Sequence, residues 1–381
     1  MNPSKCNNRL GSRRGRVLSF LCVALLFAAG GCSSLGARAM KGERTLLNTA
    51  LQQTNDEQLL INLVRFRYGD TPAFLQVSSI SSQLALDVGM SAGAELESSK
   101  PNRDLLLFGA SAGYATRPTL SYVPLQGNEF IQQLLTPLTT EKILLLYRSG
   151  WHIKRLFTIC VQGMNGLKNA PRASGPTPGR APEYEDFSKA VDLLRELERR
   201  DLVSILHAPP ASGKGAARVV LHMDPKAQAL PETRALFTLL NLSPNRLDFP
   251  LVYTQLQATH LAPVDVIEID TRSLLGLMFF LSNGVQAPEK DVKEGRVKVT
   301  SMESGQPFDW KAVLGDYLKV HADDQRPSDT QLRVNYRGHW FYIDDRDMES
   351  KATFTFLSQV FSLQAGKAEG IVPVLTLPVG R

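Results

Sequence analysis

The chain has 381 residues, of which 43 are Lys or Arg and 37 are Asp or Glu. Five of the basic residues and none of the acidic ones fall in residues 1–31, so the remaining 350 residues have a formal net charge of +1. This balance gives no reason to expect a strongly negative partner, and nucleic acid is not among the expected partners. The length leaves room for two domains.

The first 32 residues have the pattern of a secretory signal. A basic segment without acids precedes an apolar run over 17–29, and Ala29-Gly30-Gly31-Cys32 follows. The apolar run is shorter than the roughly 20 residues that span a bilayer. Cysteine after small residues resembles the lipobox of bacterial lipoproteins, with Ala29 where Leu is usual. The resemblance implies cleavage before Cys32 and a diacylglycerol on its sulfur.

Lipidation at Cys32 implies a protein of the cell envelope that is held to a membrane by its lipid. Ser33 and Ser34 come next. In lipoproteins of this kind, Ser at these positions permits sorting to the outer membrane. We therefore expect an outer-membrane anchor with the folded part facing the periplasm, and an inner-membrane anchor is the alternative. A plain signal peptide with an incidental Cys32 is the other interpretation.

Composition shifts along the chain predict five segments. They are the signal peptide at 1–31, a polar tether at 32–53, a domain at 54–169, a Pro-rich linker at 170–182 and a second domain at 183–381. Two cysteines leave with the signal, so Cys160 is the only thiol besides Cys32 and no intramolecular disulfide forms. Cys160 lies in an apolar run, which predicts a buried, unreactive thiol.

The first domain is expected to combine a long hairpin with helices. Thr54 and Glu57 have the spacing of a capping box that begins a helix. Residues 84–97 and 106–115 each alternate between apolar and small or polar residues, which predicts two antiparallel strands longer than usual. Helices are predicted at 127–135, 139–149 and 151–167.

Two interpretations of the 84–115 hairpin remain open. One face is apolar and the other small or polar, as in strands of outer-membrane barrels. A single hairpin cannot close a barrel, and lipid does not tolerate open strand edges, so a pore would need several copies of the chain. A soluble antiparallel sheet covered by helices is the interpretation we favour from the sequence.

The second domain is expected to hold helices over a small mixed sheet. Helices are predicted at 183–200, 270–284 and 347–365, strands at 202–207, 218–223, 264–269, 331–336, 339–343 and 372–377, and a tight turn at Arg337-Gly338. Together with the hairpin of the first domain, this pattern predicts an α+β fold.

Two motifs suggest chemistry, and each has a simpler explanation. Residues 208–215 resemble a phosphate-binding loop but lack its first glycine and the hydroxyl that reaches magnesium. Asp344, Asp345 and Asp347 form an acidic cluster, a weak candidate for a metal or catalytic site. They also precede a predicted helix, where acids interact favourably with the helix dipole. We therefore favour capping.

None of the six histidines stands in a metal-binding motif. They are His152, His207, His222, His260, His321 and His339. His321 with Asp323 and Asp324 is a weak metal candidate. His339, on a predicted strand beside Trp340, is expected to be a surface or packing residue.

The absence of a recognisable catalytic constellation favours a protein that is not an enzyme. We predict a non-catalytic binding or assembly component of the cell envelope, anchored through Cys32, with no metal and no cofactor. Its expected partners are the membrane, other envelope proteins and further copies of the chain. The alternatives are an oligomeric outer-membrane channel subunit that contributes the 84–115 hairpin and, less favoured, a lipid-anchored hydrolase.

Overall fold

The computed structural model describes residues 45–95, 105–209, 217–253, 265–365 and 375–378. The chain forms two compact units, one ending at Gln58 and the other beginning at Leu59. Cys32 and most of the loop that resembles a phosphate-binding loop lie outside the described residues.

Residues 45–68 form one continuous helix, so the predicted capping box at Thr54 is wrong. The Thr54 hydroxyl donates to the Ala50 carbonyl one turn earlier, and Gln53 Nε2 donates to Glu57 Oε1 at 2.9 Å. A threonine inside a helix can bond back to the preceding turn in this way. The end of the predicted tether, from residue 45, is therefore helical.

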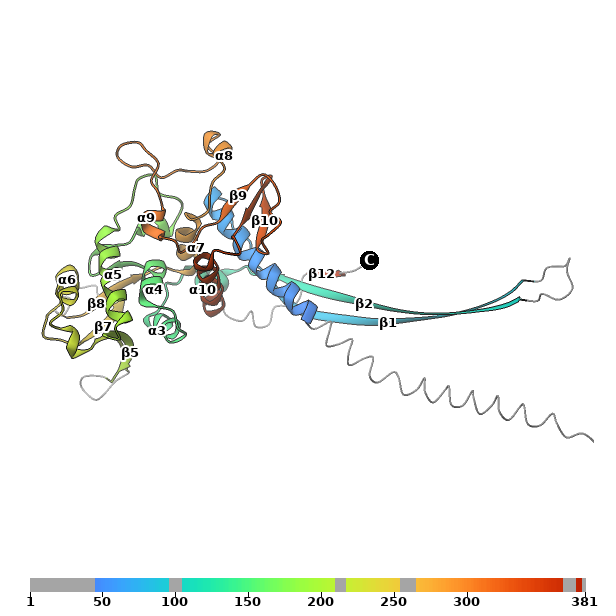
Figure 1. Ribbon diagram of the computed structural model, residues 1–381, viewed down its shortest axis with the longest axis horizontal. Coiled ribbons are helices and arrows are strands. Elements are labelled where there is room, and N and C mark those ends of the chain that lie inside the picture. Colours follow the sequence, from blue (N-terminus) through green and yellow to red (C-terminus); the bar gives the residue numbers. More distant parts are fainter. Residues whose placement is uncertain (1–44, 96–104, 210–216, 254–264, 366–374, 379–381) are drawn as a thin grey trace, which may run out of the picture. The chain divides into compact units, whose positions relative to one another are not determined.

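Nine further α-helices and two short 3₁₀ helices follow in the described chain. Their bounds are α2 Asn128–Leu135, α3 Thr140–Arg148, α4 Ile153–Cys160, η1 Pro171–Ser174, α5 Glu185–Arg199, η2 Pro225–Ala227, α6 Pro231–Leu240, α7 Leu274–Ser282, α8 Glu289–Lys293, α9 Lys311–Leu314 and α10 Met348–Ala365. Figure 1 shows these elements in chain order.

The strands form three sheets. They are β1 Leu75–Glu95, β2 Leu105–Pro124, β3 Val161–Met164, β4 Leu167–Lys168, β5 Val203–Ala208, β6 Arg218–Met223, β7 Asp248–Tyr253, β8 Ile267–Thr271, β9 His321–Asp323, β10 Arg333–Tyr336, β11 His339–Tyr342 and β12 Leu375–Pro378. The strand orders are β1-β2-β12, β10-β11-β9 and β4-β3-β8-β7-β6-β5.

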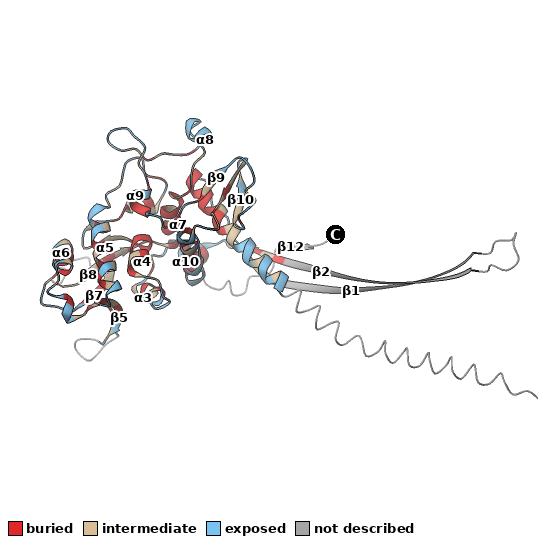
Figure 2. Cartoon of the chain, in the orientation of Figure 1, coloured by how far each residue is buried: buried red, intermediate tan, exposed pale blue. Residues whose placement is uncertain are grey.

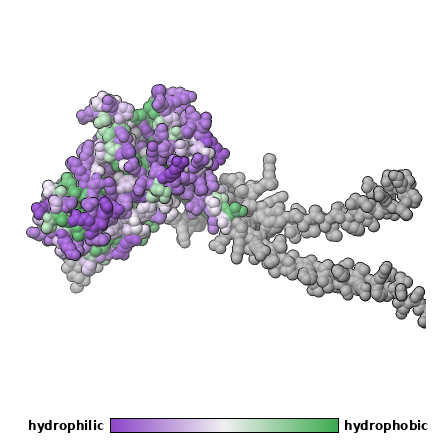
Figure 3. All heavy atoms as spheres, in the orientation of Figure 1, coloured by the Kyte–Doolittle hydropathy of each residue, from purple (hydrophilic) through white to green (hydrophobic). Residues whose placement is uncertain are grey.

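The second unit is built around a mixed sheet, which confirms the predicted α+β class. The six-stranded sheet is antiparallel except where β7 pairs with β8. Its buried residues join those of the helices in one hydrophobic core, including Phe157, Phe249, Ile269 and Phe280. In Figure 2 the buried residues gather on α4 and α7, while Figure 3 shows a largely hydrophilic described surface on the visible side.

The helix predicted at 151–167 is wrong in its second half. α4 ends at Cys160, and β3 follows directly. β3 and β4 form a hairpin around Asn165 and Gly166, which both have positive φ. Asn-Gly is the preferred pair for such a turn, because both positions require φ above zero.

The Pro-rich segment at 170–182 does not divide the molecule into the two predicted domains. β3 and β4, which precede it, belong to the same sheet as β5–β8, which follow it. Ala170 and Ala173 are fully buried, and Thr300 Oγ1 donates to the Pro178 carbonyl at 2.8 Å. Prolines here shape a 3₁₀ turn and an extended segment that pack against the core.

Arg272 is a buried residue that bonds to the backbone around β3 and β4. Its buried guanidinium donates to the carbonyls of Ile159 at 3.1 Å, Val161 at 2.8 Å and Asn169 at 2.5 Å. It also lies 3.8 Å from the centre of the Phe280 ring. Burial lowers the pKa of Arg272 to about 9. Arg272, together with the Asn169 side-chain amide, which donates to the Thr158 and Val161 carbonyls, supplies the donors that these buried carbonyls require.

Candidate functional site

The acidic cluster predicted from the sequence caps α10. The Asp347 carboxylate accepts from the Ser350 amide at 3.0 Å and from the Ser350 hydroxyl at 2.6 Å. Asp344 accepts from the Arg346 amide at 2.8 Å, and Asp345 lies 3.6 Å from Lys351 Nζ. Asp347 thus satisfies an amide that the helix leaves free at its start, while Asp344 stabilises the turn before the helix and Asp345 pairs with a lysine side chain.

Cys160 is fully buried at the end of α4, and burial raises the pKa of its thiol to about 12. A thiol in this state does not form the reactive thiolate at neutral pH. His321 stacks on Tyr342, with ring centres 5.3 Å apart. Among the described residues, no group of three or more His, Cys, Asp or Glu side chains is arranged to hold a metal.

A shallow groove of about 360 Å³ runs between α3 and α10. It is lined by Leu145, Leu146, Ser149, Ser358, Gln359, Ser362 and Leu363. The Gln359 amide oxygen already accepts from Trp151 Nε1 at 2.7 Å. Hydroxyls, one amide and leucines supply no acid, base or charged group, so this groove offers no catalytic chemistry.

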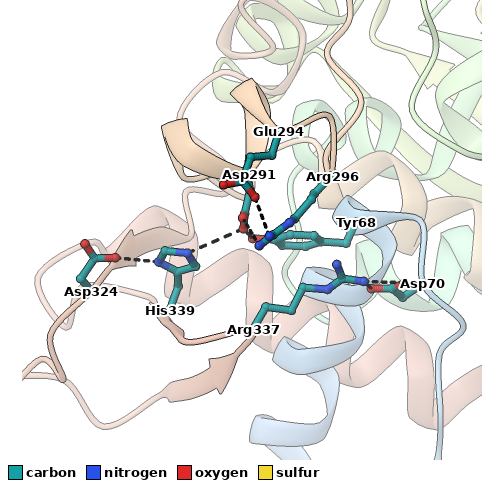
Figure 4. A network of polar contacts seen from close by, with 8 residues as sticks. All are labelled: Tyr68, Asp70, Asp291, Glu294, Arg296, Asp324, Arg337 and His339. Atoms are coloured by element: carbon teal, nitrogen blue, oxygen red, sulfur yellow. Dashed lines mark hydrogen bonds and ion pairs between the residues drawn. The ribbon is translucent and has the colours of Figure 1, made fainter.

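The densest polar arrangement is centred on Asp291, which the sequence analysis missed (Figure 4). Asp291 lies on α8 and is fully buried. Tyr68, at the end of the 45–68 helix, donates its hydroxyl to Asp291 Oδ2 at 2.5 Å. His339 of β11 places Nε2 3.7 Å from the same oxygen, and its Nδ1 lies 2.7 Å from Asp324. We call Tyr68, Asp291, His339 and Asp324, together with Arg296 and Glu294, the Asp291 network.

Arg296 completes the contacts of the buried carboxylate. Its guanidinium lies 3.1 Å from Asp291 and 2.5 Å from Glu294. Burial alone would raise the pKa of Asp291, but the Tyr68 hydrogen bond and the charges of His339 and Arg296 outweigh it and lower the pKa. The same burial and hydrogen bond raise the pKa of Tyr68. Asp291 is therefore a charged, fully partnered carboxylate inside the protein.

A second set of contacts joins the same helix end to the β10–β11 hairpin. Tyr336 donates its hydroxyl to Asp70 at 2.6 Å, and Arg337 pairs with Asp70 at 2.8 Å. Arg337 also lies 5.1 Å from the centre of the Tyr68 ring. The predicted turn at Arg337-Gly338 is confirmed, and it presents Arg337 to Asp70.

These contacts fix the segment that leads into β1. Asn62 exchanges two hydrogen bonds with the Ala73 backbone at 2.8 and 3.0 Å. Phe74 packs against Phe130 of α2 and Phe361 of α10, and its carbonyl accepts from the Leu125 amide just after β2. The Asp291 network and this packing hold the base of the β1–β2 hairpin. The charges and hydroxyls of this arrangement are partnered with one another across the segment that leads into β1, which is the geometry of a structural network.

β1 and β2 are the longest strands among the described residues, and we call them the hairpin arm (Figure 1). They pair from Leu75–Pro124 to Glu95–Leu105, with one irregularity between Val77 and Ser79. The extensive contacts of β1 are with β2, and those of β2 are with β1 and β12. The expectation that helices cover this hairpin stays a prediction.

The register brings the two alternating sequence patterns into phase. Residues directly opposite each other in an antiparallel pair share one face of the sheet. The apolar face consists of the pairs Leu84–Thr116, Leu86–Tyr114, Val88–Ala112, Met90–Ala110, Ala92–Phe108 and Ala94–Leu106. The polar face consists of Gln83–Arg117, Ala85–Ala115, Asp87–Gly113, Gly89–Ser111, Ser91–Gly109, Gly93–Leu107 and Glu95–Leu105. If the pairing of β1 with β2 were shifted by one residue, apolar residues of one strand would lie on the same face as polar residues of the other.

The outer edges of the arm are covered only near its base in the described chain. β12 pairs with β2 from Leu375–Tyr122 to Pro378–Thr119, and this sheet has the order β1-β2-β12. The apolar and polar faces defined above begin just beyond this point.

Comparisons with protein-family models, curated proteins and solved structures found no match. In the part of the chain that the structure describes, no helix has both the length and the apolar character needed to cross a bilayer.

Proposed function

We propose that this chain is a lipid-anchored, non-catalytic assembly component of the cell envelope whose working element is the hairpin arm. Copies of the arm join edge to edge and form a barrel that crosses the membrane. The observation that carries the proposal is the register of β1 and β2. It gives one hairpin an apolar face and an opposite face that is small or polar from Gln83–Arg117 to Ser91–Gly109, with Leu107 and Leu105 beyond.

The length of the apolar face supports this role. From Leu84 to Ala94 the strand has 11 residues. At about 3.3 Å per residue and a barrel tilt of about 40°, this length covers roughly 28 Å, close to the hydrocarbon thickness of about 30 Å. The residues between the base and Gln83 would extend the arm outside the hydrocarbon.

The edges of the arm explain why several copies are needed. Backbone amides and carbonyls cannot be left without partners in lipid, so a spanning sheet must be closed. Each arm supplies two strands, and β1 of one copy would pair with β2 of the next beyond the end of β12. Cys32, if lipidated, would hold all copies at the same membrane surface and raise their local concentration.

The base of the arm supports the same proposal. The Asp291 network and the packing of Phe74 fix the direction in which β1 leaves the helix. A rigid base reduces the conformational entropy that would be lost when arms align in an assembly. In this proposal the buried charges of the Asp291 network serve to orient the arm.

A matched pair of substitutions on neighbouring residues tests the proposal. Ala112 belongs to the apolar face and Ser111 to the polar face. Arg at a lipid-facing position near the bilayer midplane costs about 2–4 kcal/mol per copy, whereas Arg toward a lumen is tolerated. We expect Ala112→Arg to abolish both the high-mass assembly in detergent and the conductance of the purified protein in planar bilayers. Ser111→Arg should keep both.

The outcome that contradicts the proposal is equally clear. A wild-type protein that stays monomeric in detergent and forms no channels would refute the proposed barrel. Equal effects of Ala112→Arg and Ser111→Arg would refute the assignment of one face to lipid and the other to the lumen. The alternative of a soluble, periplasm-facing binding protein predicts a monomer for all three proteins.

A further inference from the structure

The polar face of the hairpin arm is unusually rich in small residues for a sheet that packs against other elements. Between Ala85–Ala115 and Ser91–Gly109, seven of its eight residues are Gly, Ala or Ser. Small residues lie opposite small residues at three of these four pairs, and Asp87 lies opposite Gly113 at the other. Glycine weakens a strand because it has no side chain to pack, so its repeated use here costs stability in an isolated hairpin.

In a closed barrel of these arms, the polar face is the inner face. Small barrels are filled by their inward residues, whereas larger ones leave an aqueous channel. A lining of Gly, Ala and Ser cannot fill a lumen. The arm would therefore surround water over most of the thickness of the membrane.

Asp87 lies on this face within the Leu84–Ala94 span and Glu95 lies one residue beyond it, so the charges from one end of the span to the other are acidic. Asp87 lies opposite Gly113, and Glu95 lies opposite Leu105, so neither acid has a basic residue at its paired position. Arg117 is on the same face but lies opposite Gln83, at the end nearer the base. Each acid would occur once per copy and form a ring of negative charges around the lumen. Such rings select for cations.

We propose that the lumen formed by the hairpin arms conducts hydrated cations in preference to anions, with Asp87 and Glu95 as the residues that determine this selectivity. The inference rests on the proposed function, because the rings exist only in an assembled barrel. It adds the class of solute and names two residues that touch the conduction path.

The reversal potential of the full-length protein in planar bilayers under a potassium chloride gradient tests the inference. We expect the wild type to be permeable to potassium severalfold more than to chloride. The double substitution Asp87→Asn, Glu95→Gln should bring the ratio close to one while the single-channel opening persists. Glu303→Gln, at an exposed acid far along the chain, is the matched control and should leave the ratio unchanged.

The results separate this inference from the function on which it rests. Anion-preferring or unselective wild-type channels would overturn the cation inference and leave the barrel standing. A double variant with an unchanged ratio would also overturn it, because the selectivity would then come from other residues. A protein that forms no channels at all would overturn both.

Discussion

Removing the buried Asp291 carboxylate should destabilise the second unit more than the loss of an exposed charge such as Glu294. Asp291→Ala leaves the buried Tyr68 hydroxyl without its acceptor, which costs about 1–3 kcal/mol. It also leaves His339, 14% exposed, facing the position of the lost charge. Arg296 is 45% exposed, so water can solvate its guanidinium once the ion pair with Asp291 is gone. The loss of that ion pair therefore adds little to the destabilisation. We expect a total of about 3 kcal/mol, below the upper range for a broken buried ion pair.

The assay is urea unfolding of the full-length protein in detergent, followed by tryptophan fluorescence. Glu294→Ala is the matched control, since Glu294 contacts the same Arg296 but is 39% exposed. An exposed pair of this kind contributes about 0–1 kcal/mol. A destabilisation by Asp291→Ala no larger than that of Glu294→Ala would refute the view that this network holds the base of the arm.

The same network gives a pH dependence with a defined sign. The pKa of Asp291 is lowered in the folded protein, so its carboxylate contributes stability above the unfolded pKa of about 3.9. This contribution is lost as the pH falls through the folded value. Comparing the wild type with Asp291→Asn should show a difference in unfolding free energy that is constant near neutral pH and shrinks below about pH 4.

Three further results are expected. Cys160 should react with a maleimide slowly in the native protein and rapidly in urea, because its thiol is buried and its pKa is raised to about 12; rapid native labelling would contradict its burial. Arg272→Met should lower the free energy of unfolding in urea by about 3–5 kcal/mol, because several buried carbonyls lose a donor. The control Arg246→Met, at a residue 56% exposed, should change it little. Similar losses for the two variants would argue against this role of Arg272. Cys32→Ser should abolish labelling by a palmitate analogue, and labelling equal to the wild type would exclude lipidation at this residue.

The parts of the fold that could be predicted from sequence are those with a strong local period. The alternation over 84–97 and 106–115 predicts the two long strands, and the structure extends both toward the base. The hairpin at Arg337-Gly338 is also marked by its turn residues. The strand β3 was hidden because the apolar residues of α4 continue into it without a break. The Asn165-Gly166 pair was the signal that should have ended the predicted helix.

The candidate site could not be predicted in the same way. Tyr68, Asp291 and His339 lie more than 200 residues apart at the extremes, and no local pattern links them. Asp291 stands in a short, highly charged helix, which is the usual composition of a solvated surface. The proline-rich segment misled for a related reason. Its composition is typical of linkers, but Arg272 and Thr300, far along the chain, donate hydrogen bonds to Ser174 and to the Pro178 carbonyl within it.

The combination of a long arm and a rigid base has a consequence for the isolated chain. Two strands alone are marginally stable in water, and open edges pair readily with other chains. β12 covers one edge of β2 only from Thr119 to Tyr122. The glycines that weaken the polar face also lower the stability of the unpaired arm. If the arms assemble as proposed, pairing with neighbouring edges would add stability to the arm, and the fixed base would present each arm to its neighbour in the same direction. Order in the arm should therefore depend on assembly, whereas order in the Asp291 network should not.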